Sequence, residues 1–289
     1  LPREGCNSLI CFGGGVNSIV STLAPVVVML LIGTISAKTS LRDVEVLLWW
    51  VLGIFAAAFF ALLAFRLPEP AAEREQSAAH VGILSPLRFR HAALGIAGIF
   101  FYIGIEIGVP GILNLWMLDP RGSFEATTPA VAGSVTGMFF FLMLVGRFAG
   151  SWIGGKFSSR AILAFCGAAA LTFTVVGIFA MGLVVPMAVF TCPGFEIVHV
   201  PLGCCLLAFV GLFASVSWAA TYNLTVEGLG EYTEAASGLV MTVLVGGGLL
   251  PLAQGLLADR IGYAISYAIP AFGAAYLLVY ALFFSRSSK

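Results

Sequence analysis

The sequence predicts an all-α integral membrane protein with about eight transmembrane helices. Its 289 residues are 60% hydrophobic and only 10% charged, and the mean hydropathy is +1.04. An ordinary soluble domain carries about 25% charged residues. The apolar residues also gather in runs as long as the roughly 20 residues that a helix needs to cross a bilayer. Composition and run length together indicate a multi-pass membrane protein.

Each apolar run is bounded by polar or turn-forming residues. The predicted spans are residues 9–36, 45–66, 91–117, 130–153, 161–188, 201–226, 235–257 and 262–284. The one long polar connection, residues 67–90, separates the second span from the third. It predicts a linker between two helical domains, residues 1–66 and 91–289.

The basic residues indicate how the spans are oriented. If the N-terminus is cytoplasmic, ten of the 14 lysines and arginines lie on the cytoplasmic side and four on the other side. Cytoplasmic loops of membrane proteins carry an excess of these residues. We therefore expect both ends of the chain, and the linker, to be cytoplasmic.

Several other classes of function lack their usual patterns here. The sequence shows no basic arm for nucleic acid and no phosphate-binding loop for transport driven by ATP. The three histidines, His80, His91 and His199, fall at span ends or in loops, without a set of carboxylates or metal ligands beside them. The six cysteines lack the close pairing of a zinc or redox site. We expect no enzyme activity, no metal and no cofactor.

Glu106 is the most informative residue, because it places a carboxylate near the middle of the predicted span 91–117. A charge at the bilayer centre costs roughly 2.5 to 3.5 kcal/mol even on lenient insertion scales. Pro110 follows four residues later and cannot donate the helical hydrogen bond to the Glu106 carbonyl. Two costly polar groups at one depth predict an interior lined by protein or water.

Four strings carry a resemblance to a known family. They are FRHAALGIAGIFFYIGIEIGVPG, GRFAGSWIGGKFSSR, WAATYNLTVEGLGEYTEAASGLVMTVLVGGGLLPLAQGLLADRIG and, near the start, GGGVNSIVSTLAP. They resemble, respectively, helix seven, the link between helices eight and nine, helices ten and eleven, and helix five of the fucose and glucose/galactose proton symporters. This family of bacterial sugar transporters belongs to the major facilitator superfamily. The resemblance covers essentially the whole chain and places the family's first four helices outside it.

The resemblance implies a secondary transporter that moves a monosaccharide together with protons by alternating access. Residues 91–289 would form the C-terminal six-helix bundle, and residues 1–66 the last two helices of the N-terminal bundle. The expected setting is the lipid bilayer of a bacterial plasma (inner) membrane, with the protein as a monomer. The family's proton-coupling acids lie in helices one and four, outside this chain. A partner or sensor that does not transport, or a decayed transporter fragment, is therefore the alternative.

A sugar needs hydrogen-bonding groups for its hydroxyls and an aromatic face for the apolar side of its ring. Candidates at helical spacing are Trp218 and Tyr222, with Asn223 beside them. Tyr102 lies four residues before Glu106. The other amides within or near the spans are Asn17, Asn114 and Gln254. Packing of the aromatic rings and interhelical hydrogen bonds of the amides remain alternative interpretations.

Two further segments predict how the helices move or pack. Gly146 and Gly150 form a small-xxx-small pair that lets helices approach closely, and Arg147, Lys156 and Arg160 are expected at the depth of the cytoplasmic headgroups. The resemblance implies a gate here, and a membrane-surface anchor is the alternative. The glycine run 246–248, followed by Pro251, predicts a flexible or closely packed segment.

Two positions depart from the family pattern. Gly14 stands where members carry a glutamine, three residues before the helix-five asparagine that is Asn17 here, so one implied sugar contact is missing. The position of Glu106 is often glutamine in the family. This favours a contact with the substrate, whereas a carboxylate that carries protons is the alternative.

Overall fold

The computed structural model describes residues 19, 41–64, 82–120, 127–191 and 194–285. The chain divides into two compact units, and each is described by itself. One comprises Leu1–Ile19 with Val81–Lys289, and the other comprises Val20–His80.

The smaller unit contains one described helix, α2 (Leu41–Ala64). Within it, Trp49 Nε1 donates a hydrogen bond to Glu45 Oε1 at 3.2 Å. The helix agrees with the predicted span 45–66. The predicted span 9–36 lies outside the described residues, Ile19 excepted, and so does most of the linker.

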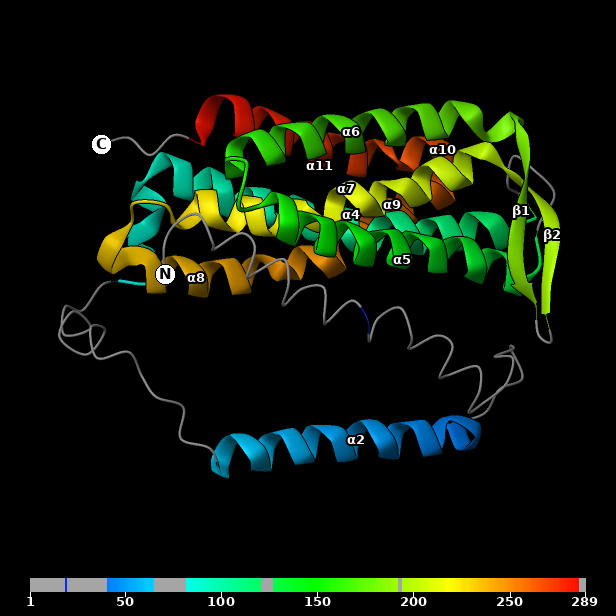
Figure 1. Ribbon diagram of the computed structural model, residues 1–289, viewed down its shortest axis with the longest axis horizontal. Helices are drawn as coiled ribbons and strands as arrows, with labels where there is room; N and C mark the ends of the chain where they lie inside the picture. The colour runs from blue at the N-terminus through cyan, green and yellow to red at the C-terminus, as the bar shows by residue number, and fades with distance from the viewer. Residues whose placement is uncertain (1–18, 20–40, 65–81, 121–126, 192–193, 286–289) are drawn as a thin grey trace. The chain divides into compact units, whose positions relative to one another are not determined.

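The larger unit contains six described segments that are long and apolar enough to cross a membrane. They run side by side, as Figure 1 shows. They are α4 (Arg90–Leu118), α5 (Pro129–Ile153), α6 (Ser159–Phe179), α7 (Leu202–Val226), α8 (Thr233–Thr242) with α9 (Gly246–Ile261), and α10 (Tyr263–Ser266) with α11 (Ala268–Val279). These segments correspond to the last six predicted spans. The expected helical membrane fold is confirmed.

Local sequence signals explain where several helices begin and end. The hydroxyls of Thr128 and Ser158 accept hydrogen bonds from the first-turn N–H groups of α5 and α6. Pro129 follows Thr128 at the first helical position, where its missing N–H costs nothing. Gly262 ends α9 with a φ of 101°, a conformation that residues with a Cβ rarely adopt.

Helices α4 and α7 form the centre of the larger unit. Just over half of each apolar span, 56%, is buried, which is the largest share among the six. Small residues let the two helices touch, since a Cβ at Gly98 would lie 3.3 Å from the Thr221 methyl group. Hydroxyls of the tyrosines Tyr276 and Tyr280 donate to α4 backbone carbonyls at 2.9 and 3.0 Å. The central helix α4 is therefore held on several sides.

A β-hairpin departs from the predicted helical span 161–188. Helix α6 ends at Phe179, a short 3₁₀ turn covers Ala180–Gly182, and the antiparallel strands β1 (Val184–Thr191) and β2 (Gly194–Pro201) follow. The hairpin crosses one end of the helices in Figure 1. Its inward side chains include Val189 and Val200, each 0% exposed. A continuous apolar run does not distinguish a strand from a helix, which explains the difference.

The glycine run 246–248 forms the first turn of α9, and its start is closely packed, which was one of the two predicted possibilities. A 3₁₀ turn, Val243–Val245, separates α8 from α9. A Cβ at Gly246 would lie 2.6 Å from the Phe100 carbonyl oxygen of α4, so the backbones nearly touch there. Gly248, in contrast, has no neighbour within 4 Å of a built Cβ.

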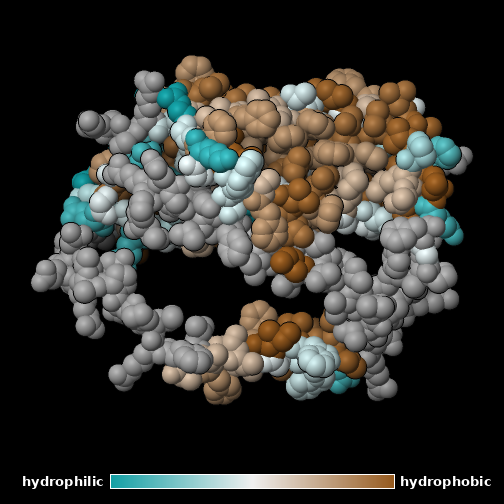
Figure 2. Space-filling model, viewed as in Figure 1, coloured by the Kyte–Doolittle hydropathy of each residue, from teal (hydrophilic) through white to brown (hydrophobic). Residues whose placement is uncertain are grey.

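The outer surface of the larger unit is largely apolar. Figure 2 shows hydrophobic side chains over most of the visible face of the helices. Exposed examples are Phe165 of α6, Leu252 of α9 and Phe272 of α11. An apolar surface of this kind is what a lipid environment favours.

Candidate functional site

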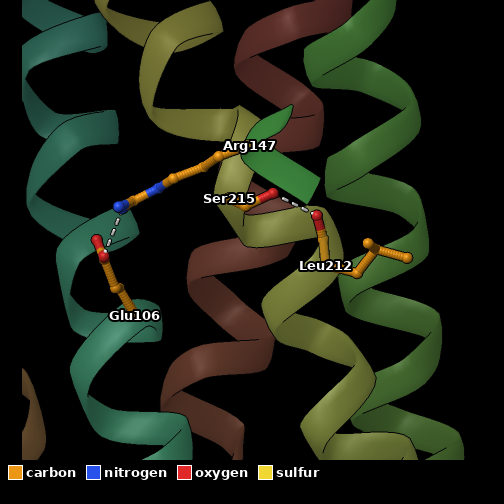
Figure 3. Close-up of polar contacts among 4 residues, drawn as sticks. All are labelled: Glu106, Arg147, Leu212 and Ser215. Atoms are coloured by element: carbon orange, nitrogen blue, oxygen red, sulfur yellow. Dashed lines mark hydrogen bonds and ion pairs between the residues drawn. The ribbon is translucent and has the colours of Figure 1, made fainter. Parts of the chain in front are cut away.

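A partly buried ion pair joins α4 and α5 of the larger unit. Arg147 Nη2 of α5 donates a hydrogen bond to Glu106 Oε1 of α4 at 2.9 Å, as Figure 3 shows. The exposed fractions of the two side chains are 10% for Arg147 and 19% for Glu106. Opposite charges at this distance offset part of the cost of burying each one. The pair explains how a carboxylate is tolerated in an apolar span.

The position of Arg147 differs from the sequence expectation. The sequence placed it at the depth of the membrane surface, with Lys156 and Arg160. The structure buries it, and its side chain extends toward α4. The long arginine side chain carries its charge well away from its own backbone. The hydropathy of the sequence does not reveal in which direction that side chain points.

A close approach of two helices lies next to this pair. A Cβ at Gly146 would collide with the hydroxyl of Ser215 and with the Leu212 carbonyl oxygen, both on α7. Ser215 Oγ in turn donates to that carbonyl at 2.6 Å, as seen in Figure 3. Only glycine permits α5 to lie this near α7, so Gly146 sets the position of its neighbour Arg147.

Two aromatic residues complete the site. The ring centroids of Tyr102 and Trp218 are 5.6 Å apart, at an interplanar angle of 47°. Tyr102 is 1% exposed, and its hydroxyl interacts electrostatically with both Glu106 and Arg147. Among the described residues, that hydroxyl has no hydrogen-bond partner of ordinary geometry. A buried phenol normally has a hydrogen-bond partner, so the Tyr102 hydroxyl is a polar group in need of one.

The site combines a carboxylate acceptor, guanidinium and phenol donors, and a half-buried indole ring. Its two charges cancel, so the described site has no net charge to attract an ion. Acceptors, donors and an aromatic face in one place suit a neutral molecule with several hydroxyls. The residues that the structure brings together from the predicted set are Tyr102, Glu106, Arg147 and Trp218.

The other predicted substrate contacts are not part of this cluster, and two of them form hydrogen bonds with residues of other helices. The Tyr222 hydroxyl bonds Ser237 Oγ of α8 at 2.9 Å, and Asn114 Nδ2 donates to Thr136 Oγ1 of α5 at 3.2 Å. Both therefore hold helices together. Asn223 is partly buried on α7. Asn17 lies outside the described residues.

Gln254 occupies the interface of α9 with α4. Its side chain is buried, and a Cβ at Gly108 would lie 2.5 Å from its Oε1. Its Nε2 has no hydrogen-bond partner among the residues that the structure describes. Gln254 remains a predicted substrate contact, and its α4 neighbour Gly108 lies two residues after Glu106.

The predicted gate residues divide between surface and core. Lys156 Nζ lies 3.7 Å from the centroid of the Trp152 ring on the exposed side of the turn after α5. Arg160 donates from Nε to the Ala281 carbonyl at 2.8 Å, and also to the Leu282 carbonyl, which ties the start of α6 to the end of the last span. Gly150 is buried on α5. For Lys156 and Arg160, the gate and the membrane-surface anchor both stay predictions.

Two polar residues of α7, the helix that carries Trp218, were missed by sequence reasoning. Ser215 packs against Gly146, and Thr221 of α7 carries a buried Oγ1 with no hydrogen-bond partner among the described residues. Both lie in the span 201–226, which also holds Trp218. A search for hydroxyls at helical spacing from Trp218 on the same helix would have found them.

Six apolar spans around an internal charged pair define a class of protein, the polytopic membrane proteins with a polar site inside the helices. This arrangement is typical of one half of a transporter built from two bundles. No protein-family profile matches the chain.

Known proteins with similar sequences are sugar transporters. The chain is 29% identical over 277 residues to a protein named glucose/galactose transporter from Brucella abortus, covering 94% of this chain and 62% of that protein. It is 24% identical over 202 residues to the L-fucose-proton symporter of Escherichia coli, covering 70% of this chain and 41% of that protein. The chain thus spans less than two thirds of the length of these relatives.

The fold is similar to a solved transporter. Over its whole length the chain matches 70% of the crystal structure of the major facilitator transporter FucP in its outward conformation, with a TM-score of 0.74 and 16% identity. A structure of the E. coli fucose:proton symporter FucP gives the same TM-score. The chain therefore has the major facilitator fold, and its relatives are sugar transporters. The resemblance predicted from the sequence is confirmed.

Proposed function

We propose that this chain forms part of a secondary transporter that moves a neutral monosaccharide of the glucose, galactose or fucose type. The observation that carries the proposal is the Glu106 carboxylate, held inside an apolar span beside Tyr102 and Trp218. The names of the relatives support the substrate class. Proton coupling is proposed because one relative is named a proton symporter.

In the proposed mechanism, the sugar lies against the α4 and α7 face of the larger unit. Glu106 accepts hydrogen bonds from sugar hydroxyls, the Tyr102 hydroxyl adds a donor or acceptor, and the Trp218 ring packs on the apolar side of the sugar. Alternating access then comes from movement of this bundle against a second one.

The domain assignment and setting belong to the same proposal. Residues 91–289 act as the C-terminal six-helix bundle, residues 67–90 as a cytoplasmic linker, and residues 1–66 as part of the other bundle. The protein lies in a bacterial inner membrane as a monomer, with both ends of the chain in the cytoplasm. The excess of basic residues on that side supports the orientation.

Uptake into proteoliposomes tests the proposal. The gene product that contains this chain is reconstituted, and labelled glucose, galactose and L-fucose are supplied with and without an inward proton gradient. We expect saturable uptake of at least one sugar, accelerated by the gradient, and none into protein-free vesicles.

The result also separates the alternative function. Binding of a sugar, measured by calorimetry in detergent, without uptake would favour a sensor or partner protein. Neither binding nor uptake of the three sugars by folded protein would contradict the proposal.

A further inference from the structure

We infer that Arg147 is a positioning residue, which orients the Glu106 carboxylate for the substrate. We also infer that the contact of Gly146 with Ser215 keeps the Arg147 guanidinium within hydrogen-bond distance of Glu106. The inference rests on the proposed function, since it concerns the same site. It assigns Arg147 to the site itself, in place of the surface gate or anchor that its sequence context suggested.

The first step is the direction of the Arg147 side chain. Consecutive residues of an α-helix point about 100° apart. Gly146 faces α7, where it meets Ser215 and the Leu212 carbonyl oxygen. Arg147 therefore leaves α5 on a neighbouring face, and Figure 3 shows its side chain extending past Ser215 toward Glu106.

The second step is the distance between α5 and α7. Any Cβ at position 146 would force the two helices apart, because one of the colliding atoms is a backbone oxygen that cannot rotate away. The Arg147 guanidinium would then withdraw from Glu106, and a shift of about 1 Å is enough to turn a 2.9 Å hydrogen bond into a weak contact.

The third step is what the guanidinium does for the carboxylate. An unrestrained glutamate side chain samples several rotamers, whereas a charge-assisted hydrogen bond holds it in one. The bond uses Oε1, and a carboxylate has further acceptor capacity on Oε2. The Tyr102 hydroxyl lies one helical turn away. A sugar with neighbouring hydroxyls can bridge these two groups only while Glu106 keeps its orientation.

The test measures sugar exchange at equilibrium, so that no proton gradient is needed. Half-saturation and maximal rate are compared for wild type, Arg147→Gln, Arg147→Lys, Gly146→Ala and the double variant Gly146→Ala with Arg147→Gln. Gly137→Ala is the matched control, because it lies on the same helix and a Cβ there has no neighbour within 4 Å.

We expect Arg147→Gln to raise the half-saturation concentration about tenfold with a smaller change in maximal rate, the sign of lost binding. Arg147→Lys recovers part of the loss, because a lysine keeps the charge but not the planar fork. Gly146→Ala shifts half-saturation in the same direction. In the double variant, Gly146→Ala causes no further shift in half-saturation, because the Arg147 guanidinium that it would displace is already absent. Gly137→Ala behaves as wild type.

Three results overturn the inference: an unchanged half-saturation in folded Arg147→Gln, a Gly146→Ala effect confined to maximal rate, or additive effects in the double variant. Each requires a wild type that exchanges sugar. A wild type that exchanges none contradicts the proposed function instead, so the two failures are distinguishable.

The positioning contact also has a readout that does not depend on transport. The midpoint of thermal unfolding in detergent is measured for Gly146→Ala in the backgrounds of Glu106 and Glu106→Gln. We expect a smaller decrease in the Glu106→Gln background, where no ion pair remains to be disturbed. Equal decreases would show that Gly146 acts on packing alone and would overturn the second half of the inference.

Discussion

Arg147 of α5 and Glu106 of α4 form an ion pair of 2.9 Å between two membrane-spanning segments, 41 positions apart in the sequence. Breaking a buried pair by removing one partner is much more costly than removing both, because the remaining charge stays buried. The pair therefore links the stability of the helices to the chemistry of the site.

The first prediction concerns the stability of this pair. Glu106→Gln or Arg147→Gln alone is expected to destabilise the protein by about 3 kcal/mol, and the double variant by clearly less than the sum. The free energy of unfolding, measured by denaturant titration in detergent, checks this. Additive effects would mean that the two charges do not interact in the folded protein.

The second prediction concerns the aromatic side of the site. Trp218→Ala is expected to raise the half-saturation concentration for sugar about tenfold, because it removes the apolar ring face, and Trp218→Phe to raise it less. The measurement is sugar uptake at a series of concentrations. Tyr222→Phe is the comparison, since the Tyr222 hydroxyl bonds Ser237 and not a site residue, and it is expected to leave half-saturation near the wild-type value.

The third prediction concerns close packing of α5 with α7. A Cβ at Gly211 would lie 2.5 Å from the Phe139 carbonyl oxygen, so Gly211→Ala is expected to destabilise the protein by about 1 to 3 kcal/mol. The yield of monodisperse protein and its thermal midpoint should both fall. Gly133→Ala, where a Cβ meets nothing within 4 Å, should retain both values.

The fourth prediction concerns the hydrogen bond between Tyr267 and the part of α4 next to Pro110. The buried Tyr267 hydroxyl donates to the Val109 carbonyl at 3.0 Å, beside Pro110. Tyr267→Phe removes the donor and leaves a buried acceptor with one partner fewer, at a cost of about 1 kcal/mol. A lower thermal midpoint with unchanged expression is the expected result. No change in the midpoint would show that this bond contributes little to stability.

Hydropathy was sufficient to locate the spans that the structure describes, because an apolar run of sufficient length reports on the bilayer directly. All six spans predicted after residue 90 correspond to helical segments of the structure. The hairpin at Val184–Pro201 was not foreseen, since its first strand continues the apolar run of α6 and periodicity does not distinguish a strand from a helix there.

The candidate site was predicted only in part. Glu106, Tyr102 and Trp218 were identified because polar and aromatic residues inside a span are informative one at a time. Which of the other polar side chains join them was not predictable. Asn114 forms a hydrogen bond with Thr136, and Tyr222 forms one with Ser237. Such pairings depend on the rotation of each helix about its axis, which the sequence does not reveal.

Hydropathy and composition alone were enough to predict a helical membrane protein, to locate the spans that the structure describes, and to single out Glu106 as a charge inside one of them. These properties depend on local composition and on the energetic cost of placing a charge in lipid. That Arg147 is the partner of this charge became visible only in the folded chain. The pairing depends on how close α4 and α5 lie, and the contact of Gly146 with Ser215, residues far apart in the sequence, brings α5 close to α7 beside it.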